Sequence, residues 1–239
     1  NLYRKELFRF DQCYRHFHRA AEQVDVLGWT LLQTLRQQVE ITYTDWFLPH
    51  LGMAWSTVIE GDHGLLASWK LPEWTSQTDF YRHKVKTVLA NPGVKRVFVI
   101  ISDAFRYEAA EELNRLINTR NKYKAALDVM LGVLPSYTAL GMAALLPHQA
   151  LAYKEGSSAL GVTVDGAPTS SLEDRNAILA KVGGMAIHWE ELQGLGKDKA
   201  RERVKDFSVI YIYHDRIDLL GDKAASEQKT FEAVSQTLE

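Results

Sequence analysis

The chain has 239 residues, of which 46% are hydrophobic and 24% charged, and its formal net charge is −2. This composition is typical of a globular protein with a sizeable core, and the near-neutral charge argues against a general polyanion-binding surface. A single cysteine excludes an internal disulfide, and no apolar stretch approaches the ~20 residues of a membrane span, so we expect a cytoplasmic protein without a membrane partner.

Residues 1–90 are predicted to form a helical segment. Apolar residues recur at helical spacing in three runs, and the third ends at Gly61, which suits a helix C-terminal cap. Five of the six tryptophans lie in this segment: Trp29, Trp46, Trp55, Trp69 and Trp74. We interpret them as packing between helices. The alternative is that they anchor a partner protein, because exposed aromatic side chains are enriched at interface hot spots.

The turn signal Asn91-Pro92-Gly93 is the predicted boundary to a second region, residues 91–239. Strands are expected at 97–101, 127–133, 151–153 and 209–213, and helices at 104–118, 139–146, 171–182 and 223–238. Strands of continuous apolar residues that alternate with helices indicate an α/β sheet covered on both faces. Ligands of such folds bind outside the carboxyl ends of the strands.

Polar side chains follow three of these predicted strands. Asp103 comes directly after the first, and Ser136 and Thr138 lie between the second and a helix. A hydroxyl there either caps the helix or acts as a nucleophile next to free backbone N–H groups. The last strand is followed by four ligand-type residues: His214, Asp215, Asp218 and Asp222. The last two could converge on one ion if the backbone turns at Gly221.

Four stretches resemble the PglZ domain, a branch of the alkaline phosphatase superfamily found in bacterial phage-defence systems of the BREX type. They are VFVIISDAFRYEAAEEL, LPSYTALGMAALLPH, VDGAPTSSLEDR and YIYHDRIDLLGDK. The resemblance implies a three-layer αβα sandwich, of which residues 91–239 would be the N-terminal part, preceded by the helical residues 1–90.

The resemblance also implies roles for individual residues. Thr138 occupies the fourth position of a P-x-x-T pattern and would be the nucleophile, with Ser136 as the alternative; Thr138 and Asp103 would bind one metal ion. Asp218 and Asp222 would bind a second ion, because they match the D-x-x-G-H motif with Asp in place of His. This all-oxygen pair shifts the expected ions from zinc towards manganese, magnesium or calcium.

One departure from the superfamily pattern limits these expectations. A further Asp-His pair is expected after the D-x-x-G-H motif, but none occurs before Glu239, so this piece of a longer protein would be inactive alone. The upstream pair Asp62-His63 is interpreted as a turn. Arg106 is expected on a helix surface, with a phosphate contact as the alternative, and His214 remains a further candidate for the site.

The function predicted from the resemblance is that of a metal-dependent phosphatase or phosphodiesterase. The substrate would be a phosphate ester, and nucleic acid is an alternative substrate by analogy only. Other BREX proteins would be its partners. The competing hypothesis is a non-catalytic scaffold that docks partners through its aromatic helices; an Asp-His-Gly after Glu239 would favour catalysis.

Overall fold

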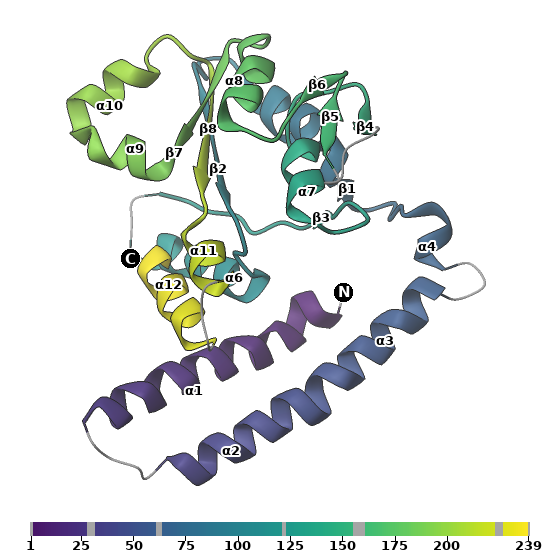
Figure 1. The fold of residues 1–239 in the computed structure, drawn as a ribbon, viewed down its shortest axis with the longest axis vertical. Helices are drawn as coiled ribbons and strands as arrows, with labels where there is room; N and C mark the ends of the chain where they lie inside the picture. The colour runs from purple at the N-terminus through teal and green to yellow at the C-terminus, as the bar shows by residue number, and fades with distance from the viewer. Residues whose placement is uncertain are drawn as a thin grey trace. The chain divides into compact units, whose positions relative to one another are not determined.

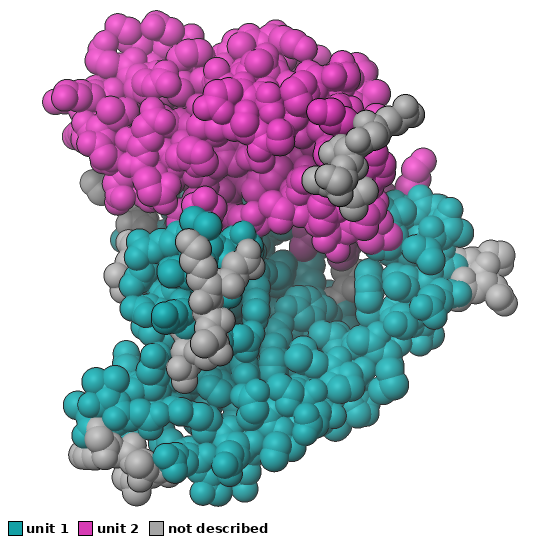
Figure 2. Space-filling view, viewed as in Figure 1, with its two compact units in different colours: residues 1–69, 104–128, 216–239 teal, residues 70–103, 129–215 magenta. Residues whose placement is uncertain are grey.

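The computed structural model describes residues 2–27, 32–60, 64–120, 123–154, 161–222 and 227–238. They form two compact units that do not follow chain order (Figure 2). Unit 1 comprises Asn1–Trp69, Ala104–Asp128 and Arg216–Glu239, and unit 2 comprises Lys70–Asp103 and Val129–Asp215. No helix within the described residues is both long and apolar enough to cross a membrane.

Unit 2 is built on a three-stranded parallel sheet in the order β2-β8-β7. Its strands are β2 (Val97–Ser102), β7 (Gly184–His188) and β8 (Val209–His214). All six residues of the central strand β8 are buried, as expected of an apolar strand with both faces covered. β2 and β8 confirm predicted strands, whereas β7 was not predicted.

Helices cover both faces of this sheet, with α7 (Thr138–Ala144) and α8 (Leu172–Ala180) on one face and α9 (Trp189–Gly194) and α10 (Gly196–Val204) on the other (Figure 1). Successive β8 side chains alternate between two cores: Tyr211 packs in the α7/α8 core, and Ile210 and Ile212 pack in the other, with Val204. The three-layer αβα arrangement is therefore confirmed.

Two predicted strands lie outside the parallel sheet. The strand predicted at 127–133 is reduced to β3 (Met130–Leu131), which pairs in parallel with β1 (Thr75–Ser76). The strand at 151–153 is present as β4, but it forms an antiparallel sheet with β5 (Val162–Val164) and β6 (Ala167–Pro168). An apolar run indicates that a strand is buried, but not which strand it pairs with.

Short helical segments complete unit 2: η3 (Gln77–Asp79), η4 (Tyr81–Lys86) and α5 (Thr87–Leu89). The start of α8 is fixed by a capping box, in which the Ser171 hydroxyl accepts from the Asp174 N–H and the Asp174 carboxylate accepts from the Ser171 N–H.

Unit 1 is helical. Its elements are η1 (Tyr3–Leu7), α1 (Phe8–Val26), α2 (Gln33–Ile41), η2 (Thr42–Phe47), α3 (Leu48–Glu60), α4 (Leu65–Ser68), α6 (Tyr107–Arg120), α11 (Arg216–Asp222) and α12 (Gln228–Leu238). Ala109 of α6, Ile217 of α11, and Ala233 and Val234 of α12 form a buried core.

The tryptophans of this segment do not form the predicted core. Trp46 and Trp55 are 52% and 48% exposed, and no residue of α3 is buried. Trp69 and Trp74 are half-buried, while Trp29, Gly61 and the Asp62-His63 pair lie outside the described residues. The interpretation as helix packing is wrong for Trp55, because helical spacing defines an apolar face without showing what covers it. The half-exposed Trp46 does contact another helix, since its ring centroid lies 6.4 Å from that of Phe10 in α1.

Candidate active site

The carboxyl ends of β2 and β8 lie side by side in unit 2. Ser102 pairs with His214 in the strand register, and the Ser102 hydroxyl lies 2.8 Å from His214 Nδ1. The half-buried Asp103 follows at once, and its backbone N–H donates to the His214 carbonyl over 2.9 Å. The parallel pairing of β2 with β8 thus brings Asp103 and His214 to the same edge of the sheet.

The backbone turns sharply after Asp103. Ala104 has a φ of 58°, in the left-handed region that costs a non-glycine residue about 1 kcal/mol. Strained residues of this kind concentrate at functional sites, where the surrounding structure holds them in place. No pattern in the sequence signals this conformation, because alanine itself favours a helix.

Thr138 is the first residue of α7 in unit 2, and Ser136 lies two residues earlier. The N-cap position is taken by Tyr137, and no side chain caps this helix. Both Ser136 and Thr138 are exposed. Neither hydroxyl therefore caps the helix, and the exposed Thr138 side chain is accessible to a reactant.

Asp218 and Asp222 belong to unit 1, where both lie in α11. The helix continues through Gly221 to Asp222, so the backbone does not make the turn at Gly221 that would let both residues converge on one ion. The two positions are separated by one helical turn instead. Asp218 is half-buried, whereas the side chain of Asp222 lies outside the described part of the chain.

The candidate ligands do not by themselves form a complete metal site. Among the described residues, no group of three or more His, Cys, Asp or Glu side chains is placed to hold an ion. The oxygen chemistry of Asp103 and Asp218 suits a hard divalent cation, but such an ion takes six to eight ligands when it is calcium and six when it is magnesium. The donors described here do not meet that requirement.

Arg106, the predicted alternative contact to phosphate, is engaged within unit 1. Its guanidinium donates from Nη2 to the Glu227 carboxylate over 3.1 Å. Burial lowers the pKa of Arg106, but the hydrogen bond and charge of Glu227 outweigh burial and raise it overall. This pairing holds the guanidinium in its charged form.

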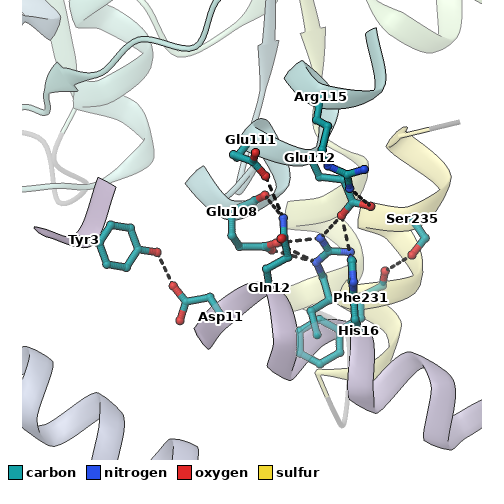
Figure 3. Close-up of polar contacts among 11 residues, drawn as sticks. Tyr3, Asp11, Gln12, His16, Glu108, Glu111, Glu112, Arg115, Phe231 and Ser235 are labelled. Atoms are coloured by element: carbon teal, nitrogen blue, oxygen red, sulfur yellow. Dashed lines mark hydrogen bonds and ion pairs between the residues drawn. The ribbon is translucent and has the colours of Figure 1, made fainter. Parts of the chain in front are cut away.

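A buried ionic cluster, which we call the Arg15 cluster, joins α1 to α6 in unit 1 (Figure 3). It comprises Arg15, His16, Glu108 and Glu112. Arg15 donates from Nε to Glu108 Oε1 (2.9 Å) and from Nη2 to Glu108 Oε2 (2.7 Å) and Glu112 Oε2 (2.6 Å). His16 Nε2 lies 2.9 Å from the same Glu112 oxygen. Glu108, in the first turn of α6, is only 1% exposed.

We expect Glu112 to make the stability of the chain sensitive to acid. Burial raises the pKa of this carboxyl, but hydrogen bonds from Arg15 and His16 outweigh burial and lower it overall. Because its folded-state pKa lies below the unfolded value of about 4.3, its contribution is complete above that pH and is lost as pH falls through the folded pKa.

Urea denaturation at a series of pH values from about 7 to 3 would measure this loss. Glu112→Gln should be less stable than the parent near pH 7, and the difference should shrink as pH falls below about 4.3. A difference that stays constant across the series would contradict the assignment.

Comparison with known proteins identifies the proteins that this chain resembles. The BREX system PglZ alkaline phosphatase-like domain matches residues 80–239. The alkaline phosphatase-like protein BrxZ of Escherichia coli O9:H4 (strain HS) is 46% identical over 231 residues, which cover 97% of this chain and 26% of that protein. The alkaline phosphatase-like protein PglZ of Bacillus cereus (strain H3081.97) is 38% identical over 239 residues, which cover 99% of this chain and 27% of that protein.

No solved structure matches the chain. The chain spans about a quarter of the length of the two curated relatives. Its match to the PglZ domain covers 160 residues, counted from 80 to 239, which is more than half of its 239 residues. The chain belongs to the PglZ family of alkaline phosphatase-like proteins from BREX systems.

Proposed function

We propose that the full-length protein containing this chain is a metal-dependent phosphatase or phosphodiesterase that uses Thr138 as its nucleophile. The observation that carries the proposal is the accessible Thr138 hydroxyl, which caps no helix and lies in the P-S-Y-T match to the superfamily pattern. The position of Asp103 also supports the proposal. This carboxylate lies at the carboxyl edge of the β2-β8 pair, which is where α/β folds bind their ligands.

In the proposed reaction, Thr138 Oγ attacks the phosphorus of a phosphate ester. The Oγ–P bond forms as the ester P–O bond breaks, and the hydroxyl proton passes to the leaving oxygen. Water then cleaves the phosphothreonine, which releases phosphate and restores the hydroxyl. Bound divalent ions would offset the negative charge of the phosphate oxygens. Asp103, Asp218 and Asp222 are the proposed ligands in this chain, and the remaining ligands would come from elsewhere in the full-length protein.

A second candidate function is a docking scaffold for other BREX proteins. It is favoured by the exposed apolar side chains of α3, where Met53, Trp55 and Val58 are 60%, 48% and 57% exposed. Exposed tryptophan is the residue type most enriched at interface hot spots. Scaffolding and hydrolysis are compatible in one protein, so the experiment must measure turnover itself.

Chelation provides that experiment. We expect the full-length protein to hydrolyse bis(p-nitrophenyl) phosphate or p-nitrophenyl phosphate, to lose this activity in EDTA, and to regain it with added manganese, magnesium, calcium or zinc. The 239-residue chain, whose described residues place no group of three ligand-type side chains together, should be inactive under the same conditions. Turnover that persists in EDTA would refute metal dependence, and no turnover with any of the four ions would favour the scaffold.

A further inference from the structure

A polar pocket of about 480 Å³ lies in unit 2, at the end of the sheet opposite Asp103. Val182, which lines it, precedes the first residue of β7 by two positions, whereas Asp103 follows the last residue of β2. Because β2, β8 and β7 are parallel, their amino and carboxyl ends lie at opposite edges. The pocket is therefore separate from Asp103.

Basic side chains from three separate elements converge on this pocket. Arg82 and Lys86 come from η4, Lys181 follows α8, and His148 follows α7. Within the described residues, neither lysine forms an ion pair. His148 Nδ1 lies 2.7 Å from the Leu146 carbonyl oxygen, so Nδ1 carries the proton and Nε2 is the nitrogen left for a ligand.

The two carboxylates of the pocket already have partners. Asp79 pairs with Arg82. Asp165 accepts from the backbone N–H groups of Gln149 (3.0 Å) and Ala150 (2.8 Å), and these bonds, that of Ala150 foremost, lower its pKa. The three permanent cations outnumber the two carboxylates by one, so the pocket keeps a positive charge, although the charge of Lys181 also acts on Asp165.

The floor of the pocket is apolar. Its open apolar surface comes from the half-buried Tyr81, Pro147 and Val182, and Leu146, Val164 and Ile178 are fully buried behind them. A volume of about 480 Å³ is within the range of small-molecule sites, which combine apolar walls with a few convergent polar groups. A simple inorganic anion would leave this floor uncovered.

We propose that this pocket binds a small phosphorylated molecule with an aromatic body, of the nucleoside monophosphate class, at a site distinct from the proposed hydrolytic one. Lys86, Lys181 and Arg82 bind the phosphate, and the base packs on Tyr81, Pro147 and Val182. The proposal goes beyond the proposed function and does not depend on it.

Isothermal titration of the purified protein with adenosine monophosphate in EDTA tests the site. Adenosine, which lacks the phosphate, and inorganic phosphate, which lacks the base, should each bind at least about tenfold more weakly. Lys86→Glu and Lys181→Glu should each weaken adenosine monophosphate binding about tenfold or more. Both lysines are exposed, so neither change threatens folding. Lys199→Glu, at an exposed position of α10, is the matched control and should leave binding unchanged.

Three results would overturn the proposal: no binding at millimolar adenosine monophosphate, equal binding of inorganic phosphate, or equal losses in the lysine variants and the control. Binding of a DNA duplex, but not of the mononucleotide, through the same lysines would assign the patch to nucleic acid and also overturn it. Asp103→Asn separates the two sites: mononucleotide binding that depends on Asp103 would place the ligand at the hydrolytic site and refute a distinct pocket.

Discussion

Thr138→Ala in the full-length protein is expected to lower the rate of phosphate-ester hydrolysis about a thousandfold or more. The substitution removes the only atom that can form the proposed phosphothreonine. The side chain is exposed and caps no helix, so the thermal unfolding curve should remain close to that of the parent. Steady-state turnover of p-nitrophenyl phosphate and its diester, with the activating ion in excess, measures the effect.

Ser136→Ala is the matched control for this change. Ser136 is also an exposed hydroxyl, two residues away and in the same loop. Its removal should leave turnover within a few-fold of the parent, whereas Asp103→Ala should reduce turnover as severely as Thr138→Ala. Loss of activity in Ser136→Ala with full activity in Thr138→Ala would transfer the nucleophile to Ser136, and unaltered rates in Thr138→Ala and Asp103→Ala would refute both assignments.

Glu108→Ala is expected to lower the free energy of unfolding by about 3–5 kcal/mol. The change leaves the Arg15 guanidinium, 3% exposed, without the carboxylate that now accepts its hydrogen bonds from Nε and Nη2. Glu112 still accepts from Nη2, but Nε is left without its acceptor, and the buried charge keeps its desolvation cost with one carboxylate fewer. Urea denaturation followed by circular dichroism measures the difference.

Glu111→Ala on the same helix is the control. Glu111 accepts a hydrogen bond from the neutral Gln12 over 3.2 Å, and its loss should cost only about 1 kcal/mol. The double variant Arg15→Met, Glu108→Leu should recover much of the stability lost in Glu108→Ala, because apolar replacements of a buried ion pair are often neutral. Equal effects of Glu108→Ala and Glu111→Ala would show that the Arg15 cluster contributes no more than a surface contact.

A strand of the sheet was predictable from the sequence where its own residues form a continuous apolar run. β2 and β8 are continuous apolar runs, a pattern that predicts burial on both faces. The prediction holds for β8, whereas Phe98 and Ile100 of β2 are 49% and 63% exposed. β7 was missed because Gly184–His188 is five residues long and begins with glycine, which is depleted in strands. The run 127–133 was read as a strand of the same sheet, but pairing is decided by partners such as Thr75–Ser76 that lie far away in sequence.

The position of Asp103 next to His214 was predictable for a similar reason. The rule that parallel strands share a carboxyl edge places Asp103 beside His214 without knowledge of any contact. By contrast, Arg15 and Glu108 are 93 residues apart, and nothing in either helix identifies the other as its partner. The left-handed backbone of Ala104 and the exposure of Trp46 likewise depend on the packing of other segments.

Mass-spectrometric mapping of a trapped phosphoenzyme tests the nucleophile most directly. The full-length protein would be mixed with its ester substrate, quenched in acid within milliseconds to seconds, and digested. The account predicts one phosphorylated peptide that contains residues 133–140, with the phosphoryl group on Thr138 and absent in Thr138→Ala. A phosphoryl group on Ser136, or turnover that proceeds in Thr138→Ala without any phosphopeptide, would contradict it.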